Sequence, residues 1–574
     1  MSTTCQGTGA DILVEALVRA GVRVLFGFPG DTGVALYDAL DRRRDAITHV
    51  LAHDERAAAS MADGYARASR RLGVVEASSG GGATFLVGGL GEPFAASVPL
   101  LVITSDIHRL SRGTSAITEV DQQKLFSAVT KAQWVVERAS DMAERVTAAI
   151  ARAWDGRPGP VSLIIPENVF DELGTAEFSP APEGPGRDAR PTGSADWLGA
   201  ATAAAQALSR ARRPALLLGS GVHWSQTYAV VRALAERAGA AVATTIHGKG
   251  TFDESHPLSL GVVGANGAQD YTNRSLARAD VVFMVGTRAN STDTDGFRSP
   301  RRDGPQVFHL DIDPARAGRN YPGSTPLVGD AAVILPRVLE GLPPSNETRR
   351  RAIQAAIRAE RAHVEEQRGL APLVGLSPRD VVEALQAAYG HEATVVGDAG
   401  TPTPYLAAYW RTTGTRREVI LPRGHGAMGF ALPAAVGLAW ADPGRPVIAM
   451  TTDGSLGMAC GELGTIARLN TPVLILHLRN GSLGWIKALQ HFYLDHRYFG
   501  VDLKPVDAVK IAEGFGIPAV CTPTLASLQE AITEARAGLV PRFVDIPIPE
   551  EFEYVPPVAP WAATLMGAAE RPVY

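Results

Sequence analysis

Two short polar segments near the C-terminal end of the sequence could together hold a metal ion. Thr452-Asp453-Gly454-Ser455 follows the apolar run 447–451, and Asn480-Gly481-Ser482 follows the apolar run 473–477. Asn480 comes 27 positions after Asp453, which leaves room for one helix and one strand. We therefore expect both segments at the carboxyl edge of neighbouring parallel strands, where open α/β sheets bind their ligands.

The residues of these two segments suit Mg²⁺ and a diphosphate. Asp453 offers a carboxylate oxygen, Asn480 an amide oxygen and Ser482 a nearby backbone carbonyl, and Mg²⁺ completes such a partial shell with phosphates and water. Gly454 lets the backbone approach a phosphate, and Ser455 can donate to it at the start of a helix. The alternative is two ordinary turns at chance spacing, because short motifs have false positives.

The elements that must position these segments alternate between strand-like and helix-like runs along the whole chain. This alternation predicts an α/β fold with three consecutive domains, each with a central, mostly parallel sheet flanked by helices. The domains are predicted at residues 1–173, 194–342 and 377–574, with linkers at 174–193 and 343–376. The strands expected are 24–26, 49–52, 100–104 and 161–165 in the first domain, 215–218, 241–245, 281–285 and 307–312 in the second, and 394–396, 447–451, 473–477 and 542–546 in the third.

Three further segments need individual interpretation. The second linker contains a charged stretch, 347–368, that is expected to form an exposed helix. The apolar run 85–104 is interrupted by Glu92 and Pro93, so we expect a buried strand and turn rather than a membrane span. The tail 550–574 carries several prolines and aromatic residues and is expected to wrap a surface. The three blocks look like copies of one architecture.

Composition excludes several classes of protein. The 574 residues carry a formal net charge of −5 with a sequence pI near 6.3, so neither nucleic acid nor an anionic membrane is an expected partner. Three scattered cysteines, Cys5, Cys460 and Cys521, argue against a disulfide scaffold and fit a reducing cytoplasm. The first ten residues lack the pattern of a signal peptide.

Three other segments combine turns with single reactive or bulky side chains. Glu55 opens a helix-like run, where a first-turn carboxylate commonly serves the helix dipole. Gly397-Asp398-Ala399-Gly400 follows a predicted strand. Met428, within Gly424-His425-Gly426-Ala427-Met428, would ordinarily be a core residue.

Together, and in this order along the chain, these elements resemble the thiamine diphosphate (ThDP)-dependent enzymes of the acetolactate synthase and pyruvate oxidase-like family. The family's diphosphate motif is Gly-Asp-Gly followed after about 27 residues by Asn-Asn. Here Thr452 replaces its first Gly and Arg479 its first Asn, while Asp453 and Asn480 are retained. Phe26-Gly27-Phe28-Pro29-Gly30 resembles the family's Phe-Gly-x-Pro-Gly turn. The resemblance covers roughly residues 8 to 550.

The resemblance implies a role for each matching residue. Glu55 would be catalytic, hydrogen-bonding N1′ of the aminopyrimidine, and Met428 would prop the cofactor into a bent shape. The metal ligands would be Asp453, Asn480 and the carbonyl at Ser482. Cofactor contacts would come from Pro29, Gly30, Glu55, Ala399, Gly400, Gly426, Met428, Asp453, Gly454, Ser455, Asn480, Ser482, Leu483 and Gly484.

The resemblance also implies an assembly and leaves a second cofactor open. The first and third domains would bind the pyrimidine and the diphosphate across a subunit interface, so a homodimer or homotetramer is expected. The central domain often holds FAD in this family. Three glycine-rich segments could contact a nucleotide here, although such segments are common in α/β domains: Gly219-Ser220-Gly221, Gly264-Ala265-Asn266 and Gly286-Thr287-Arg288. Residues 290–295 replace the Asp-Asp-Arg of acetolactate synthases.

The predicted substrate pocket departs from the acetolactate synthase pattern. Ile117 and Thr118 replace Phe and Gln ahead of a retained Glu119, Trp485 replaces Met, and Leu489 replaces Trp. Polar groups in a pocket discriminate substrates strongly. We therefore expect a specialised 2-oxo acid donor and carbonyl acceptor. His53 and His425 are candidate acid–base groups, whereas His477 is expected to be packed.

The sequence thus predicts a ThDP- and Mg²⁺-dependent 2-oxo acid decarboxylase and carboligase. The alternatives within the same fold are an FAD-containing oxidase or acyltransferase and a non-catalytic paralogue. Retention of Glu55, Asp453 and Asn480 argues against the last of these.

Overall fold

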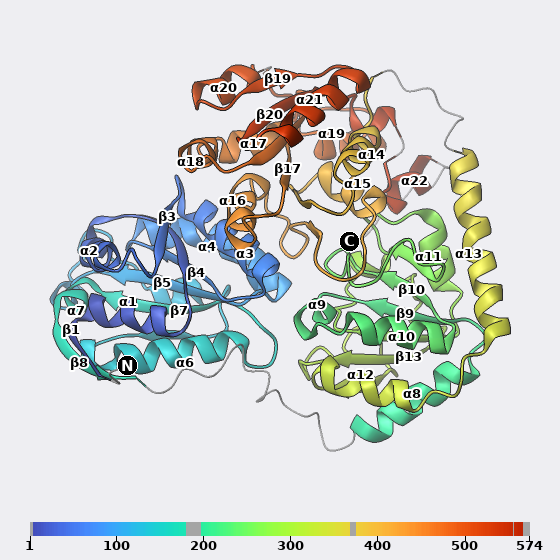
Figure 1. Cartoon of the computed structure of the whole chain (residues 1–574), viewed down its shortest axis with the longest axis horizontal. Coiled ribbons are helices and arrows are strands. Elements are labelled where there is room, and N and C mark those ends of the chain that lie inside the picture. The colour runs from blue at the N-terminus through green and yellow to red at the C-terminus, as the bar shows by residue number, and fades with distance from the viewer. Residues whose placement is uncertain (1–3, 179–196, 368–374, 505, 555, 566–574) are drawn as a thin grey trace.

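A computed structural model describes residues 4–178, 197–367, 375–504, 506–554 and 556–565. It contains three six-stranded sheets, one in each third of the chain, and every strand pairing within them is parallel. Helices flank each sheet (Figure 1). The predicted α/β fold class is therefore confirmed.

The N-terminal sheet has the strand order β3-β2-β4-β5-β7-β6. Its strands are β2 (Val24–Phe28), β3 (Thr48–Leu51), β4 (Gly73–Ala77), β5 (Leu100–Asp106), β6 (Gln133–Val135) and β7 (Val161–Pro166). Its helices are α1 (Gly9–Arg19), α2 (Val34–Arg42), α3 (Glu55–Ser69), α4 (Gly81–Ala96), α5 (Gln122–Phe126), α6 (Met142–Trp154) and α7 (Glu167–Asp171).

The central sheet has the order β11-β10-β9-β12-β13-β14. Its strands are β9 (Pro214–Leu218), β10 (Ala241–Thr244), β11 (Ser259–Val262), β12 (Val281–Val285), β13 (Gln306–Asp311) and β14 (Thr325–Val328). Its helices are α8 (Trp197–Arg210), α9 (Gly221–Ser225), α10 (Tyr228–Ala238), α11 (Asp270–Ala277) and α12 (Ala331–Glu340).

The C-terminal sheet has the order β16-β15-β17-β18-β20-β19. Its strands are β15 (Thr394–Gly397), β16 (Val419–Ile420), β17 (Val447–Thr452), β18 (Val473–Arg479), β19 (Ala519–Cys521) and β20 (Arg542–Pro547). Its helices are α14 (Pro378–Tyr389), α15 (Pro402–Tyr409), α16 (Ala431–Ala441), α17 (Asp453–Ala459), α18 (Glu462–Arg468), α19 (Gly484–Tyr493), α20 (Ala508–Gly514), α21 (Leu525–Ala537) and α22 (Ala559–Leu565).

The N- and C-terminal sheets share one topology, and the central sheet has another. Numbered within each sheet, the outer two have the order 2-1-3-4-6-5 and the central one has 3-2-1-4-5-6, the order of dinucleotide-binding folds. The three domains therefore share one architecture, as expected, but the central sheet differs in its strand order. In each sheet the order reverses beside its first strand, which places a crevice at the carboxyl ends of β2 and β4, β9 and β12, and β15 and β17.

Two segments differ from the sequence-based expectation. The run 85–104 forms the end of helix α4 followed by the buried strand β5, so the expected buried strand is confirmed, whereas helix replaces the expected turn ahead of it. Its glycines and Pro93 suggested a break, but Leu86 and Leu90 recur at helical spacing and are buried. The predicted linker at 174–193 begins as strand β8 (Leu173–Glu177), which pairs antiparallel with β1 (Thr4–Thr8). The rest of that linker lies outside the described residues.

Helices α3 and α16 join the N- and C-terminal domains directly. Their backbones touch, since a Cβ added at Gly64 would lie 2.5 Å from the carbonyl oxygen of Ala434, and one at Gly437 would overlap that of Met61. Buried side chains of both domains form one continuous core around this contact. Figure 1 shows the two helices side by side between the outer sheets.

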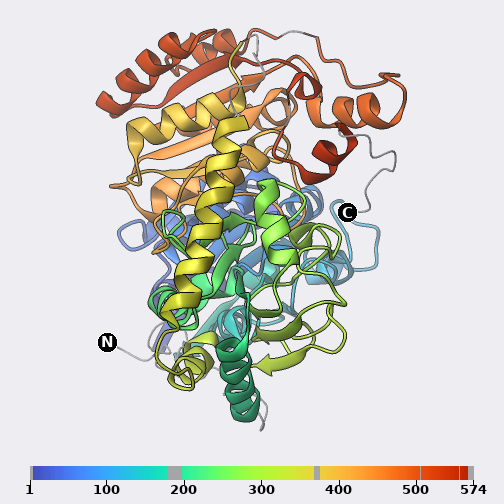
Figure 2. The ribbon, with the colours of Figure 1, turned by 90° about the vertical axis from the view of Figure 1, so that its right-hand side faces the viewer.

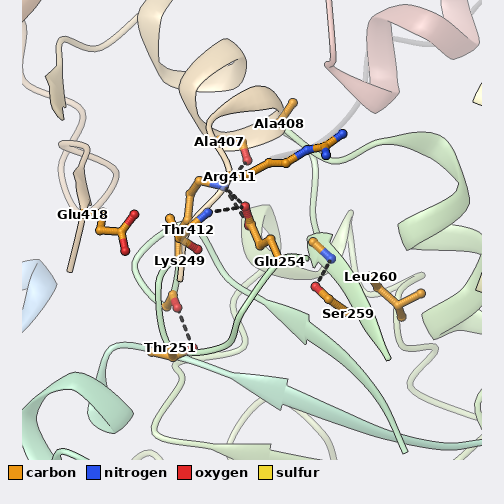
Figure 3. Close-up of polar contacts among 12 residues, drawn as sticks. Lys249, Thr251, Glu254, Ser259, Leu260, Ala407, Ala408, Arg411, Thr412 and Glu418 are labelled. Atoms are coloured by element: carbon orange, nitrogen blue, oxygen red, sulfur yellow. Dashed lines mark hydrogen bonds and ion pairs between the residues drawn. The ribbon is translucent and has the colours of Figure 1, made fainter. Parts of the chain in front are cut away.

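A buried ion pair of the central domain hydrogen-bonds the backbone of the C-terminal domain. Lys249 Nζ donates to both carboxylate oxygens of Glu254, at 2.7 and 2.8 Å, and to the carbonyl of Ala407 at 2.9 Å (Figure 3). Glu254 also accepts from the backbone N–H of Thr412. The helix expected over 347–368 forms as α13 (Glu347–Gln367), which runs along the outside between these two domains (Figure 2).

Candidate cofactor site

Glu55 is the first residue of α3 and lies at the crevice of the N-terminal sheet. Asp54 caps this helix by accepting from the backbone N–H groups of Arg56 and Ala57, at 2.7 and 3.3 Å. Only 7% of Glu55 is exposed. Burial raises the pKa of the Glu55 carboxyl above its ordinary value, and the nearby charges of Asp54 and Glu76 raise it further.

Small residues keep the space around Glu55 narrow. A Cβ added at Gly82 would lie 3.0 Å from Glu55 Oε1 and 2.7 Å from Ser78 Oγ, and one at Gly30 would overlap the Ser78 side chain. Gly30 and Pro29 directly follow β2, and Ser78 directly follows β4. Glu55, Pro29 and Gly30, named separately from the sequence, therefore lie at one crevice.

Thr118 and Ile117 lie on the long connection between β5 and β6. Thr118 Oγ1 accepts from Ser79 Oγ at 2.8 Å, and a Cβ added at Gly80 would lie 2.6 Å from Thr118 Cβ. Thr118 is thus next to the turn that faces Glu55, whereas Ile117 is 89% exposed. The structure brings one of these two predicted pocket residues to the Glu55 crevice and leaves the other at the surface.

Asp453 and Asn480 meet at the carboxyl edge of the C-terminal sheet. Their strands β17 and β18 are parallel neighbours, as the spacing predicted. Asp453 Oδ2 accepts from the backbone N–H of Asn480 at 2.9 Å and of Gly481 at 3.2 Å. Asn480 Oδ1 accepts from the backbone N–H of Ser482 at 3.2 Å. The three predicted metal-binding residues therefore form one compact loop.

Glu550 from the tail completes this loop, and no sequence motif predicted it. Glu550 Oε2 accepts from Asn480 Nδ2 at 3.4 Å and from Ser482 Oγ at 2.8 Å. Lys487 Nζ donates to Glu550 Oε1 at 2.5 Å. Because its Nδ2 donates to Glu550, the amide of Asn480 turns Oδ1 towards the other side of the loop. The only sequence signal was the acidic pair Glu550-Glu551 after the last strand.

The residues of this loop fit a Mg²⁺ diphosphate. The donor set is one carboxylate, one amide and one backbone carbonyl, which suits a hard cation that takes its remaining ligands from phosphate and water. The buried Ser455 hydroxyl lies at the start of α17, where it could donate to a bound phosphate. Within the described ranges, no group of three His, Cys, Asp or Glu side chains forms a metal cluster of its own.

Met428 and Leu483 lie over Gly454. A Cβ added at Gly454 would be 2.6 Å from Met428 Cε and 2.8 Å from Leu483 Cδ2. Only a glycine therefore allows both side chains to approach the loop after β17. Gly426, two residues before Met428, has a φ of +79°, a conformation that glycine adopts without strain. Gly484 begins α19 beside this loop.

Asp398 ties the neighbouring loop after β15 to the start of α16. Its carboxylate accepts from the backbone N–H groups of Phe430 and Ala431, at 2.7 and 3.1 Å, and from Thr451 Oγ1 at 2.8 Å. Burial raises the pKa of Asp398 to about 6. Ala399 and Gly400 follow it at the carboxyl end of β15, in the same crevice as Asp453.

Trp485 and Leu489 pack against the tail. The rings of Trp485 and Trp561 have centroids 4.4 Å apart, and Leu489 joins them around Ala488 and Val558. The tail therefore covers α19, as expected for residues 550–565. Trp561 was not predicted as a pocket residue, because its place depends on a contact between distant parts of the chain.

The histidines named from the sequence have separate environments. His53 Nδ1 lies 2.9 Å from Thr465 Oγ1, and its backbone N–H donates to Glu462. His425 places its ring against Gly91. His477 is buried as expected, with Nδ1 2.9 Å from Asp545 Oδ1.

The predicted cofactor residues fall into two groups, here called half-sites, one at the crevice of each outer sheet. The first half-site contains Glu55 and the turns after β2 and β4. The second contains Met428 and the loops after β15, β17 and β18. Glu55 lies against Gly82 of its own domain, and Met428 lies against Gly454 of its own domain. Both half-sites occupy the order-reversal crevice of sheets with the same topology.

A cavity lies at the crevice of the central sheet. Two of the three glycine-rich segments line it, contributing Ser220, Gly221, Gly286, Thr287 and Arg288. The third segment instead pairs with the tail, where Asn266 and Val558 form an isolated bridge.

The opposite wall of this cavity comes from the N-terminal domain. Ala95, Ser97 and Trp154 contribute to it. Arg157 and Arg316 also line the cavity, together with Asp311, whose pKa is raised to about 6 by burial. The cavity therefore combines several cationic groups with glycine-rich backbone.

Comparison with known proteins gives the same three-part division. The chain matches the thiamine pyrophosphate enzyme N-terminal TPP binding domain over residues 7–125, the central domain over 201–338 and the C-terminal TPP binding domain over 398–546. An acetolactate synthase of Arthrospira platensis is 33% identical, with 96% of each chain covered. A probable acetolactate synthase large subunit of Methanocaldococcus jannaschii is 32% identical over 96% of this chain and 93% of that protein. The acetolactate synthase isozyme 3 large subunit of Escherichia coli is 30% identical over 92% of each. With half-sites at both predicted sheets and relatives along nearly its whole length, the chain belongs to the thiamine pyrophosphate enzymes and is acetolactate synthase-like.

Proposed function

We propose that this enzyme is a ThDP- and Mg²⁺-dependent decarboxylase and carboligase that removes CO₂ from a 2-oxo acid and joins the remaining acyl unit to a second carbonyl compound. The observation that supports it most is that two crevices of the same topology carry different reactive groups. One contains a buried carboxyl, Glu55, and the other contains the Asp453–Asn480 loop. The relatives are named acetolactate synthases, so an oxidase, an acyltransferase or a non-catalytic role is not favoured.

The protein's part in the reaction is to hold and orient the cofactor and to control one proton. When bound, ThDP supplies the nucleophilic carbon and the electron sink that decarboxylation requires. Burial raises the pKa of Glu55, so its carboxyl binds a proton more readily than an exposed one and could share it with a ring nitrogen. Asp453, Asn480 and the Ser482 carbonyl would hold Mg²⁺, and Met428 would support the bent cofactor.

A homodimer or homotetramer is part of this proposal, as the resemblance to the family implies. Exposed apolar side chains surround each half-site, as expected for a covered surface. They include Val34, Phe85 and Ile117 on the N-terminal domain and Met458 and Ile486 on the C-terminal domain. A second copy of the chain would cover them and bring Glu55 of one chain to Met428 of the other.

A complementation experiment tests this arrangement. Glu55→Gln and Asp453→Ala are each expected to be nearly inactive, but mixed chains would contain one site with neither substitution. Recovery of activity on mixing the unfolded variants and refolding them together supports a shared site. No recovery, although mixed oligomers form, would show that each site lies within one chain.

The donor and acceptor are proposed to be specialised. The pocket side chains Thr118, Trp485 and Leu489 differ from the acetolactate synthase pattern, and Trp561 adds bulk beside them. A panel of 2-oxo acids, each with and without an aldehyde or second 2-oxo acid, followed by CO₂ release, tests the proposal. If the enzyme forms acetolactate from pyruvate alone, it has the ordinary acetolactate synthase activity and the proposed specialisation is wrong.

We further propose that the central cavity holds the nucleotide part of FAD. Its place at the β9–β12 crevice is where dinucleotides bind in this strand order. The flavin spectrum of the purified protein tests this directly. Absence of flavin from protein refolded with excess FAD would contradict it.

The remaining proposals concern domain limits and location. We propose the domain limits 1–173, 194–342 and 377–574, which enclose the three matched regions. A cytoplasmic location is proposed from the three cysteines, all of which are free. No helix of the described residues is long and apolar enough to cross a membrane.

A further inference from the structure

A single carboxylate, Glu92, lies where the three domains meet. It belongs to α4 of the N-terminal domain and is 1% exposed. Glu92 Oε2 accepts from the backbone N–H groups of Gly424 at 2.8 Å and His425 at 2.6 Å, in the C-terminal domain. Its Oε1 lies 3.4 Å from Nε2 of His247, in the central domain.

Shape complementarity reinforces these hydrogen bonds. A Cβ added at Gly424 would lie 3.1 Å from the carbonyl oxygen of Glu92, and one at Gly91 would lie 2.8 Å from the His425 ring. The backbone at Gly424 and His425 therefore crosses α4 in direct contact. Two residues later the same segment reaches Gly426, and then Met428.

The charge of Glu92 is balanced by fixed partners. Arg67 Nη2 donates to Glu92 Oε1 at 3.0 Å, while Asp63 accepts from Arg67 at 2.6 and 2.8 Å. Burial alone would raise the pKa of Glu92, but His247 and Arg67 hold that pKa well below its ordinary value. Glu92 therefore accepts hydrogen bonds from Arg67, Gly424 and His425, as an ionised carboxylate does.

Arg67 extends the junction to the far side of the Met428 segment. Its guanidinium lies 5.8 Å from the ring centroid of Phe430. Phe430 in turn donates its backbone N–H to Asp398. The segment 424–430 is thus held by Glu92 at its start and by Asp398 and Arg67 at its end, with Met428 between them.

We infer that Glu92 is a positioning residue, which fixes the backbone from Gly424 to Met428 and thereby the place of the Met428 side chain over Gly454. This inference rests on the proposed function only for the role of Met428 towards the cofactor. The anchoring itself is a property of the chain without any ligand. Because His247 also lines the central cavity beside Arg288, one carboxylate connects the wall of that cavity with the Met428 segment.

Amide hydrogen exchange of the cofactor-free protein tests the anchoring. In Glu92→Ala the N–H groups of Gly424 and His425 lose their acceptor, so exchange in a peptide covering 423–429 should rise at least about tenfold. Peptides of α3 and α16 should exchange as in the wild type. Glu172→Ala is the matched control, because Glu172 also accepts from an arginine and a backbone N–H, of Arg109 and Ala139, but within its own domain.

A second variant covers failure of Glu92→Ala to fold. Glu92→Gln keeps the size of the side chain and one acceptor oxygen, so an intermediate rise in exchange is expected. If 423–429 stays as protected as in the wild type in a folded Glu92 variant, or if exchange rises equally in α3 and α16, the positioning role is wrong.

Turnover separates this inference from the proposed function. With ThDP and Mg²⁺ added, Glu92→Gln should lower kcat for 2-oxo acid decarboxylation about tenfold while KM changes little, because substrate contacts are unaltered. Faster exchange in 423–429 with unchanged kcat would overturn the link to Met428. An inactive wild type with the expected exchange pattern would instead remove the proposed function and leave the anchoring in place.

Discussion

The indole rings of Trp485 and Trp561 lie with their centroids 4.4 Å apart and their planes inclined by 42°. One ring belongs to α19, directly after the Asn480–Gly484 loop, and the other to the tail. Trp561 is fully buried, and Trp485 is half-buried. The tail therefore forms a wall beside the position where the family pattern places substrate selection.

Trp561→Ala should change the choice of acceptor. Removing the indole opens space behind Trp485, so the ratio of kcat/KM for a bulky over a small acceptor should rise by about 10–200-fold. Competition between two acceptors, read from the product ratio, measures this. Trp197→Ala, on α8 of the central domain, is the control. An unchanged product ratio in a folded Trp561→Ala protein would show that Trp561 does not limit the acceptor.

Glu55→Gln should lower turnover by about 10²–10⁴-fold while cofactor binding stays close to wild type. The amide keeps the shape of the carboxyl but cannot share a proton in the same way. Single-turnover CO₂ release, with ThDP binding followed by tryptophan fluorescence, separates the two effects. Glu144→Gln removes a first-turn carboxylate from α6 and should have no effect. Wild-type turnover in Glu55→Gln would sink the assignment of Glu55.

Glu550→Ala should weaken Mg²⁺ binding by about 10–100-fold, because the Asn480 amide loses the acceptor that orients it. Titration of Mg²⁺ at saturating ThDP, read by fluorescence, measures the affinity. Glu553→Ala changes an exposed carboxylate in the same segment and serves as the control. Equal Mg²⁺ affinity in both variants would show that Glu550 does not orient Asn480.

Lys249→Met should destabilise the protein by about 3–5 kcal/mol, because Glu254 then remains as a buried charge without its partner. Urea unfolding measures the free energy. The double variant Lys249→Met/Glu254→Leu should recover much of the loss. Lys124→Met removes an exposed ion pair with Asp121 and should change stability little. A small decrease in the free energy of unfolding of Lys249→Met would mean that water or another group compensates the charge of Glu254.

Local patterns predicted the three sheets and the places of several candidate residues. Strand alternation predicted β9, β12, β17 and β18, and the spacing of Asp453 and Asn480 predicted their contact, because both features depend on short stretches of chain. Helix α4 was missed, since its glycines and Pro93 resemble a break although its leucines follow a helical period.

Contacts between distant segments could not be predicted in the same way. Glu92, Glu550 and Trp561 meet their partners across 332, 70 and 76 positions of the chain. Nothing in their immediate surroundings encodes those partners. The different strand order of the central sheet is likewise a property of crossover connections rather than of any single strand.

The direct contact of α3 with α16 gives each chain a spacer of fixed length. Gly64 and Gly437 leave no room for side chains between these helices, so substitutions there can only push them apart. In the proposed dimer, two rigid chains rather than adjustable loops then set the distance between the site for the pyrimidine end and the site for the diphosphate end of a bound cofactor. Analogues with a longer or shorter tether between those ends would be rejected by the scaffold itself, even where every contact at either end is preserved.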